Sequence, residues 1–131
     1  MRGARLRVYK VKVFARFQRR ERIADTTLAK AVQSAERGLV DADLGGGLIK
    51  QRVARPGQGK SGGFRTVIAF RRGDLAIFLL GFAKNERGNI EDDELEDLKG
   101  QARAFFRLTM DQIEAAIAED ELMEVDYGDE D

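Results

Sequence analysis

The stretch from Leu48 to Phe82 reads LIKQRVARPGQGKSGGFRTVIAFRRGDLAIFLLGF, and it decides the fold. It holds three runs rich in aliphatic and aromatic residues, at 48–54, 64–70 and 75–82, and each run is typical of a strand. Turn residues at 71–74 predict that the last two runs form an antiparallel hairpin. The third run is the most apolar and is expected to be the central strand. The glycine-rich segment 55–63 predicts a flexible loop.

The residues before this stretch predict one strand and two helices. Leu6–Val13 alternates between polar and apolar residues, which indicates a half-exposed strand. Phe14–Glu21 fits a short helix, and apolar residues at helical spacing predict a second helix over 25–38, begun by an N-cap cluster at Asp25–Thr27. The segment 40–47 is expected to be a loop.

The residues after this stretch predict two further helices and an acidic tail. An apolar stripe follows the acidic segment Asn89–Asp93, and Thr109 with Gln112 forms a capping-box pattern for a helix to about Ala118. Glu119–Asp131 holds eight acidic residues, and it fits either a short strand or a disordered tail. We therefore expect an α+β fold, with a small antiparallel sheet and helices on one face. Residues 1–107 would form the main domain, and residues 108–131 a C-terminal helix and acidic tail.

The charge of the chain is divided between its two parts. Residues 1–88 contain 20 Lys and Arg against 7 Asp and Glu, whereas residues 89–131 contain 3 Lys and Arg against 16 Asp and Glu. A basic body attracts polyanions such as nucleic acids, because each neutralised phosphate releases counterions. A dipolar but inert surface is the alternative interpretation. An acidic tail lying close to the basic residues would compete with RNA, and a tail that only improves solubility would not.

The residue types that are missing exclude several kinds of chemistry. The chain has no cysteine and no histidine, so disulfides, thiol nucleophiles and an imidazole base are excluded. We expect no cofactor and no metal. No apolar run approaches the roughly 18 residues that a membrane span requires, and no apolar segment follows the basic N-terminus as in a signal peptide. We therefore expect a cytoplasmic protein that has no membrane partner.

Basic residues gather on the predicted strands and at their ends. Lys50 and Arg52 share one face of the first strand, and Arg65 lies on the next strand, on the face opposite Phe64. One rim of the sheet can bring these groups together with Lys60, Lys84, Asn85 and Arg87. Arginine offers a bidentate fork and lysine a point charge to a phosphate. A solvated basic face without a ligand is the alternative.

Two chemical interpretations of this basic cluster differ in strength. Ala54–Ser61 fits a loose form of the Walker A motif, but glycines and a predicted strand follow it where a P-loop requires a helix, so nucleotide hydrolysis is not expected. RNA cleavage by the adjacent 2′-hydroxyl requires fewer catalytic groups from a protein than nucleotide hydrolysis does. The phosphate must be held, the developing charge stabilised and a proton moved. Clustered cations can hold the phosphate and stabilise the developing charge. They also lower the pKa of a neighbouring lysine, which can then act as the base.

Two segments of the sequence resemble a known family. Asp43–Thr66 (DLGGGLIKQRVARPGQGKSGGFRT) and Gly81–Ile90 (GFAKNERGNI) are similar to the RelE-type toxins of bacterial type II toxin–antitoxin systems, in a HigB-like branch. The resemblance covers roughly Leu6–Ala102. It implies a twisted antiparallel sheet packed by two N-terminal helices, and ribosome-dependent mRNA cleavage that stops growth. It also implies neutralisation by a helix-turn-helix antitoxin.

The resemblance assigns roles to individual residues. Lys50 and Arg52 match the basic strand of the family, Arg65 its strand arginine and Lys84 the lysine after the last strand. These four are the expected catalytic residues, and Lys60, Asn85 and Arg87 are expected to bind RNA. RelE itself has a catalytic tyrosine near its C-terminus, and that role is not carried over to Tyr127. Two other functions stay open: a ParE-like toxin that binds a protein target such as DNA gyrase, and a non-catalytic RNA- or ribosome-binding module.

Overall fold

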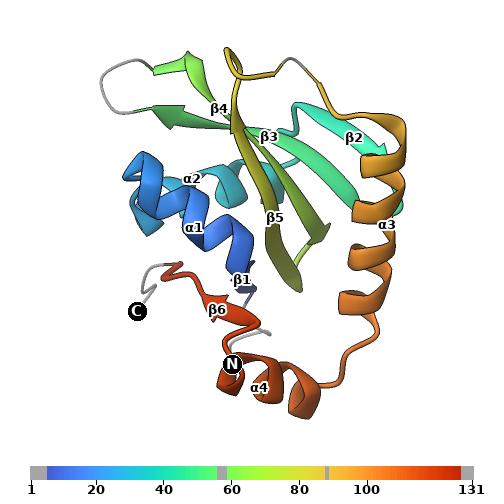
Figure 1. Ribbon diagram of the computed structural model, residues 1–131. Helices are drawn as coiled ribbons and strands as arrows, with labels where there is room; N and C mark the ends of the chain where they lie inside the picture. The colour runs from blue at the N-terminus through green and yellow to red at the C-terminus, as the bar shows by residue number, and fades with distance from the viewer. Residues whose placement is uncertain (1–5, 56–58, 88, 128–131) are drawn as a thin grey trace.

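The computed structural model describes residues 6–55, 59–87 and 89–127, with residues 59–62 described by their backbone alone. The elements in chain order are β1 (Arg7–Val11), α1 (Lys12–Glu21), α2 (Asp25–Glu36), β2 (Ala42–Gly45), β3 (Leu48–Arg55), β4 (Gly59–Arg71), β5 (Leu75–Ala83), α3 (Asp92–Phe106), α4 (Met110–Ala118) and β6 (Leu122–Glu124). The strands form one sheet in the order β2-β3-β4-β5-β1-β6 (Figure 1). The predicted α+β class is therefore confirmed.

The sheet is mixed, because one pair of strands is parallel in a sheet that the sequence predicted to be antiparallel. β3, β4 and β5 form the expected antiparallel meander. β1 pairs in parallel with β5, with Arg7 opposite Leu75 and Lys10 opposite Phe78. A parallel pair needs a long connection between its strands, and the chain between β1 and β5 contains two helices and three other strands. Local sequence patterns do not reveal such a distant pairing.

Helices cover both faces of the sheet, whereas the sequence predicted helices on one face. α1 and α2 pack Phe14, Phe17, Leu28 and Val32 against one face, and α3 and α4 pack Leu98, Ala102 and Ile113 against the other. In Figure 1 the sheet lies between α1 and α2 on one side and α3 on the other. The reason is the central strand, because Leu75–Leu79 of β5 is apolar and buried at every position. A strand without polar alternation needs cover on both faces.

Several boundaries differ from the sequence prediction. β4 begins at Gly59, inside the segment that was expected to be a loop, and β2 lies inside the expected loop 40–47. Residues 56–58 lie outside the described residues. Asp25 is not an N-cap: Ala24 takes that position, and the Asp25 carboxylate instead accepts hydrogen bonds from Lys10 and Gln18. A distant partner therefore outweighs the local capping preference of aspartate.

The C-terminal segment is part of the sheet. α4 begins with the predicted capping box, in which Thr109 and Gln112 bond reciprocally. β6 pairs antiparallel with β1, and the side chains of Leu122 and Val125 are buried. Of the two alternatives for this segment, the strand is the one observed. β6 lies at the opposite end of the strand order from β2 and β3, so described residues 119–127 do not lie along the basic strands. Residues 128–131 lie outside the description.

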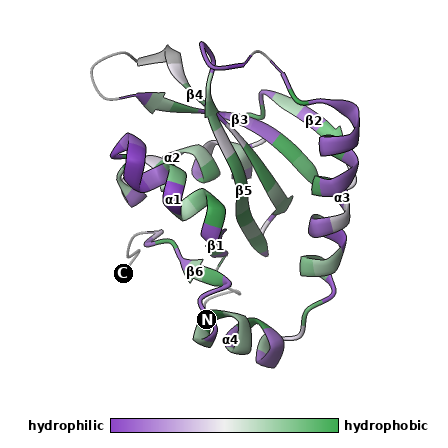
Figure 2. Ribbon diagram, viewed as in Figure 1, coloured by the Kyte–Doolittle hydropathy of each residue, from purple (hydrophilic) through white to green (hydrophobic). Residues whose placement is uncertain are grey.

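No helix in the described part of the chain is long and apolar enough to cross a membrane. Figure 2 shows that the hydrophobic residues concentrate in the strands between the helices, whereas α1 and α3 carry long hydrophilic stretches.

Candidate functional site

Two arginines stand directly opposite each other on neighbouring strands. Arg52 of β3 and Arg65 of β4 are register partners, so their side chains lie on the same face of the sheet. The backbone N–H of Arg52 donates to the Asp41 carboxylate rather than to β4, so the arginines form a non-hydrogen-bonded pair, in which side chains approach most closely. Like charges in this arrangement destabilise a sheet. A bound anion removes that repulsion.

The same row continues across β5. Arg65 is the register partner of Phe82, and the Arg87 guanidinium lies over the Phe82 ring, 4.7 Å from its centroid. Arg87 also forms a bidentate ion pair with Glu94 in the first turn of α3, at 2.7 and 3.1 Å. The face therefore presents Arg52, Arg65 and the Phe82–Arg87 stack side by side. We call the residues Lys50, Arg52, Arg65 and Lys84 the basic row.

The other predicted site residues occupy three different positions. Lys50 lies on the same face of β3 as Arg52, half-buried and opposite Val67. Lys84 and Asn85 are exposed in the turn that follows β5, directly after the residues paired with Arg65 and Phe64. Lys60 belongs to β4, but its side chain lies outside the described residues. Because Lys60 and Ser61 are in a strand, the Walker-like segment does not open a helix, as expected from the sequence.

The cations of the basic row and Arg87 beside it differ in how strongly acidic groups hold them. Arg87 is engaged by Glu94, and Arg52 lies 3.7 Å from the Asp41 carboxylate. The Arg65 guanidinium has only a long contact, 3.5 Å, to the Gly63 carbonyl. Within the described residues no acidic side chain pairs with Lys50, Arg65 or Lys84. These three are therefore the cations most available to a phosphate.

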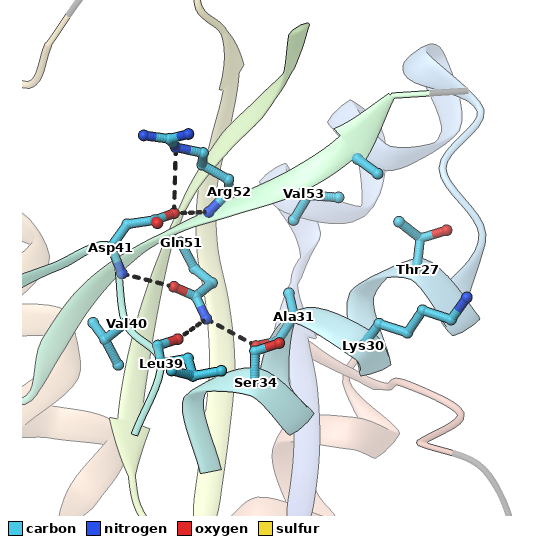
Figure 3. A pocket seen from close by; sticks show the side chains of 11 residues that line it. Thr27, Lys30, Ala31, Ser34, Leu39, Val40, Asp41, Gln51, Arg52 and Val53 are labelled. Carbon is cyan, nitrogen blue, oxygen red and sulfur yellow. Dashed lines mark hydrogen bonds and ion pairs between the residues drawn. The ribbon is translucent and has the colours of Figure 1, made fainter. Parts of the chain in front are cut away.

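A layer of polar contacts that the sequence analysis missed supports Arg52 from behind. Buried Gln51 donates to the carbonyls of Ala31 and Leu39 and accepts from the Asp41 backbone, which fixes Asp41 beside Arg52 (Figure 3). Gln51 points into a cavity of about 370 Å³ between α2 and β3, while the Arg52 side chain points away from it. A glutamine at a core-facing strand position, in phase with Ile49 and Val53, is the signal that could have revealed this support.

The comparison with protein families matches this architecture. The family model described as the RelE toxin of the RelE / RelB toxin-antitoxin system matches residues 6–125, nearly the whole chain. The chain belongs to the RelE toxin family. It is therefore a toxin of a toxin–antitoxin system, and the RelE family implies an antitoxin as its partner. The match ends at Val125, so it includes α4 and β6 as well as the meander. A comparison with curated proteins gave no match.

Proposed function

We propose that this toxin is a ribosome-dependent mRNA endoribonuclease of the cytoplasm, neutralised by a helix-turn-helix antitoxin. The observation that carries the proposal is the Arg52–Arg65 pair, in which two cations repel each other on one face of the sheet. RelE family membership supports it further, since these toxins are generally ribonucleases. No described feature favours a gyrase-binding toxin over this function.

The basic row suits cleavage by the adjacent 2′-hydroxyl. Arg52 and Arg65 would hold the non-bridging oxygens of the scissile phosphate and stabilise the charge that develops on them. One of the two lysines, Lys50 or Lys84, would take the proton from the 2′-hydroxyl. The 2′-oxygen then bonds to phosphorus as the bond to the 5′-oxygen breaks, which leaves a 2′,3′-cyclic phosphate and, after protonation, a 5′-hydroxyl.

The remaining predicted residues would act at the margins of this site. Asn85 is exposed beside Lys84 and would contact the RNA chain next to the cut. Arg87 contacts Phe82 and Glu94, so its main role would be to fix the start of α3 beside the site. Lys60 would approach the RNA backbone from the β3–β4 hairpin.

Substitutions in the basic row test the proposal through growth. Expression of the wild type without antitoxin should arrest growth, and Arg65→Ala or Lys84→Ala should relieve the arrest. Losing a contact made in the transition state costs about 10²–10³ in rate. The matched controls are Arg72→Ala, in the β4–β5 turn at the other end of the hairpin, and Lys30→Ala on α2, because both residues are exposed cations. Both controls should remain toxic.

The comparison of growth requires that the wild type and all variants are folded and present in equal amounts. Circular dichroism should show the same fold for all variants, and immunoblotting should show matched amounts. Arg65→Ala also removes the repulsion between Arg65 and Arg52. The variant loses no ion pair that the described residues form, so its thermal stability should not be lower than that of the wild type for this reason. If the two basic-row variants arrest growth as strongly as the two controls, these residues do not form the site.

A further inference from the structure

A second basic surface lies on α1, and the proposed cleavage site does not use it. Five cations of this helix and its C-cap are exposed: Lys12, Arg16, Arg19, Arg20 and Arg22. Glu21 is the one acidic residue in α1, and it contacts Arg20 at 3.4 Å. We refer to the five cations as the α1 basic face. Their helix-mates Phe14 and Phe17 are buried against the sheet, so the cations point outward.

Arg19 and Arg20 in the last turn of α1 complement the helix dipole, but other charges on this helix oppose its stability. Lys12–Arg16 and Arg16–Arg20 are like-charge pairs four residues apart, which repel on a helix surface. Lys12 stands in the first turn, where no acidic residue complements the helix dipole. A surface shaped by stability alone would alternate the signs of its charges. The like charges therefore indicate a polyanionic ligand that compensates their repulsion.

Aromatic stacking connects this face to the β3–β4 hairpin. The Arg20 guanidinium lies 5.6 Å from the Phe17 ring centroid, Phe17 packs edge-on against Phe64 at 5.4 Å, and Arg55 lies 5.2 Å from Phe64. Figure 2 shows the hydrophilic C-terminal end of α1 close to this hairpin. Phe64 and Arg65 are neighbours that point to opposite faces of β4, so the α1 basic face and the basic row lie on opposite sides of the sheet.

We propose that the α1 basic face binds the phosphate backbone of a structured RNA, a different stretch from the one that is cut. This deepens the proposed function, because it gives a ribosome-dependent nuclease a second, non-cleaving contact with RNA. Four of the five cations are arginines, whose fork suits phosphate. Val13 is the single large apolar side chain exposed on this helix, whereas a protein-binding patch would have an apolar or aromatic centre. The chemistry therefore favours RNA over an acidic segment of the antitoxin.

The experiment measures binding rather than cleavage. The probe is a short RNA duplex with methylated 2′-hydroxyls, which cannot be cut, and the readout is its Kd across a range of salt concentrations. Arg16→Ala/Arg19→Ala should weaken binding and lower the slope of log K against log salt by about 2, one for each lost phosphate contact. Its thermal stability should stay equal or rise, because alanine favours helix and the repulsion is gone.

The control variant is Arg37→Ala/Arg72→Ala, which removes the same charge from two exposed arginines outside α1. It should retain the wild-type slope. If the α1 variant and the control weaken binding equally, net charge is responsible and the α1 site is wrong. If the α1 variant binds RNA normally but loses the antitoxin, the face serves that protein instead. Absence of mRNA cleavage in the wild type would overturn the proposed function and leave this measurement intact.

Discussion

At the scale of single residues, Gly81 shows how closely the core approaches the proposed site. It lies in β5 next to Phe82, and a Cβ atom at this position would stand 2.4 Å from the Phe17 ring and 3.0 Å from Phe14. Both rings are buried and hold α1 against the sheet. Position 81 therefore has no room for a side chain unless α1 or β5 moves, and a shift of β5 would also displace Lys84.

We predict opposite effects for alanine at two glycines. Gly81→Ala should lower the free energy of unfolding by about 1–3 kcal/mol, because overpacking forces the core to shift. Gly100→Ala, inside α3, should raise it by roughly 0.5–1 kcal/mol, because its Cβ would meet no atom closer than 3.7 Å and alanine favours helix. Urea denaturation measures both. Equal stabilities for the two variants would contradict the packing described here.

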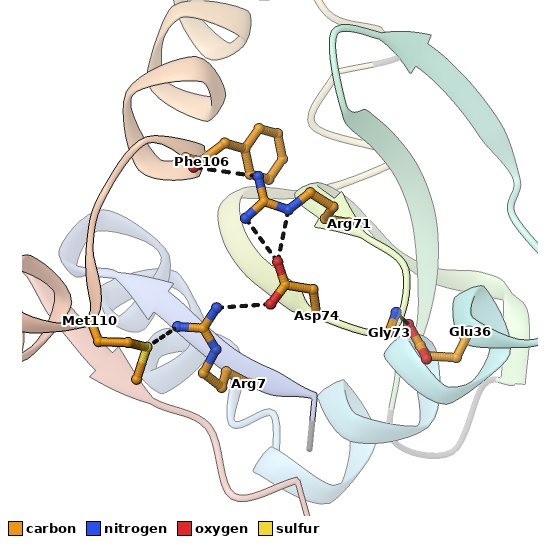
Figure 4. A network of polar contacts seen from close by, with 7 residues as sticks. All are labelled: Arg7, Glu36, Arg71, Gly73, Asp74, Phe106 and Met110. Atoms are coloured by element: carbon orange, nitrogen blue, oxygen red, sulfur yellow. Dashed lines mark hydrogen bonds and ion pairs between the residues drawn. The ribbon is translucent and has the colours of Figure 1, made fainter. Parts of the chain in front are cut away.

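At the scale of elements, two polar networks fix β1 and the segment after β6 to the core. Asp25 accepts hydrogen bonds from Lys10, Gln18 and the backbone of Asp126, which joins α2 to β1, α1 and the segment after β6. The Asp74 carboxylate accepts hydrogen bonds from Arg7 and Arg71 (Figure 4). The Arg71 guanidinium also stacks on the Phe106 ring and donates to the Phe106 carbonyl. Arg7 also contacts the Met110 sulfur. The second network holds the α3–α4 connection beside the β4–β5 turn.

These networks predict a loss of stability in acid. Burial acts to raise the pKa of Asp25, but hydrogen bonds from Gln18, the Asp126 amide and Lys10 outweigh it and hold the pKa below its ordinary value. Hydrogen bonds from Arg7 and Arg71 lower the pKa of Asp74. In acid the unfolded state therefore binds more protons than the folded state. The stabilisation contributed by Asp25 and Asp74 is fully present above about pH 4 and is lost as the pH falls through their pKa values in the folded state.

Asp25→Asn isolates the first network. It should lower the free energy of unfolding at neutral pH by about 1–2 kcal/mol, because the hydrogen bonds to a charged acceptor are weakened. Its stability should also depend less on pH below about 4 than that of the wild type. Thermal unfolding followed by circular dichroism from neutral to acidic pH measures both. A variant with the same acid dependence as the wild type would show that Asp25 does not contribute.

The elements also show what the sequence could predict. The meander, both C-terminal helices and the opposite orientations of Arg65 and Phe64 follow from local periodicity, and all are observed. The parallel β1–β5 pair and β2 depend on contacts between residues distant in the chain, which local patterns do not specify, whereas the core-facing position of Gln51 is a local signal whose partners only the fold reveals. Arg52 and Arg65 were expected to be near each other, but their register became visible only in the folded hairpin. The role of the basic row stays a prediction.

At the scale of the whole molecule, the charge is divided between a basic part, residues 1–88, and an acidic part, residues 89–131. The Arg87–Glu94 ion pair joins a cation from residues 1–88 to an acidic residue from residues 89–131. β6 lies at the edge of the sheet away from β3, so described residues of the acidic segment do not neutralise the basic row. The basic row therefore remains open to polyanions.

The most direct test of the central claim is cleavage of a translated mRNA by purified protein in a reconstituted translation system, with the new ends mapped by primer extension. The account predicts cuts bearing 5′-hydroxyl ends only when ribosomes translate the message, and cleavage slower by about 10²–10³ for Arg65→Ala but not for Arg72→Ala. An intact message during active translation, or equal cutting by wild type and Arg65→Ala, would contradict it.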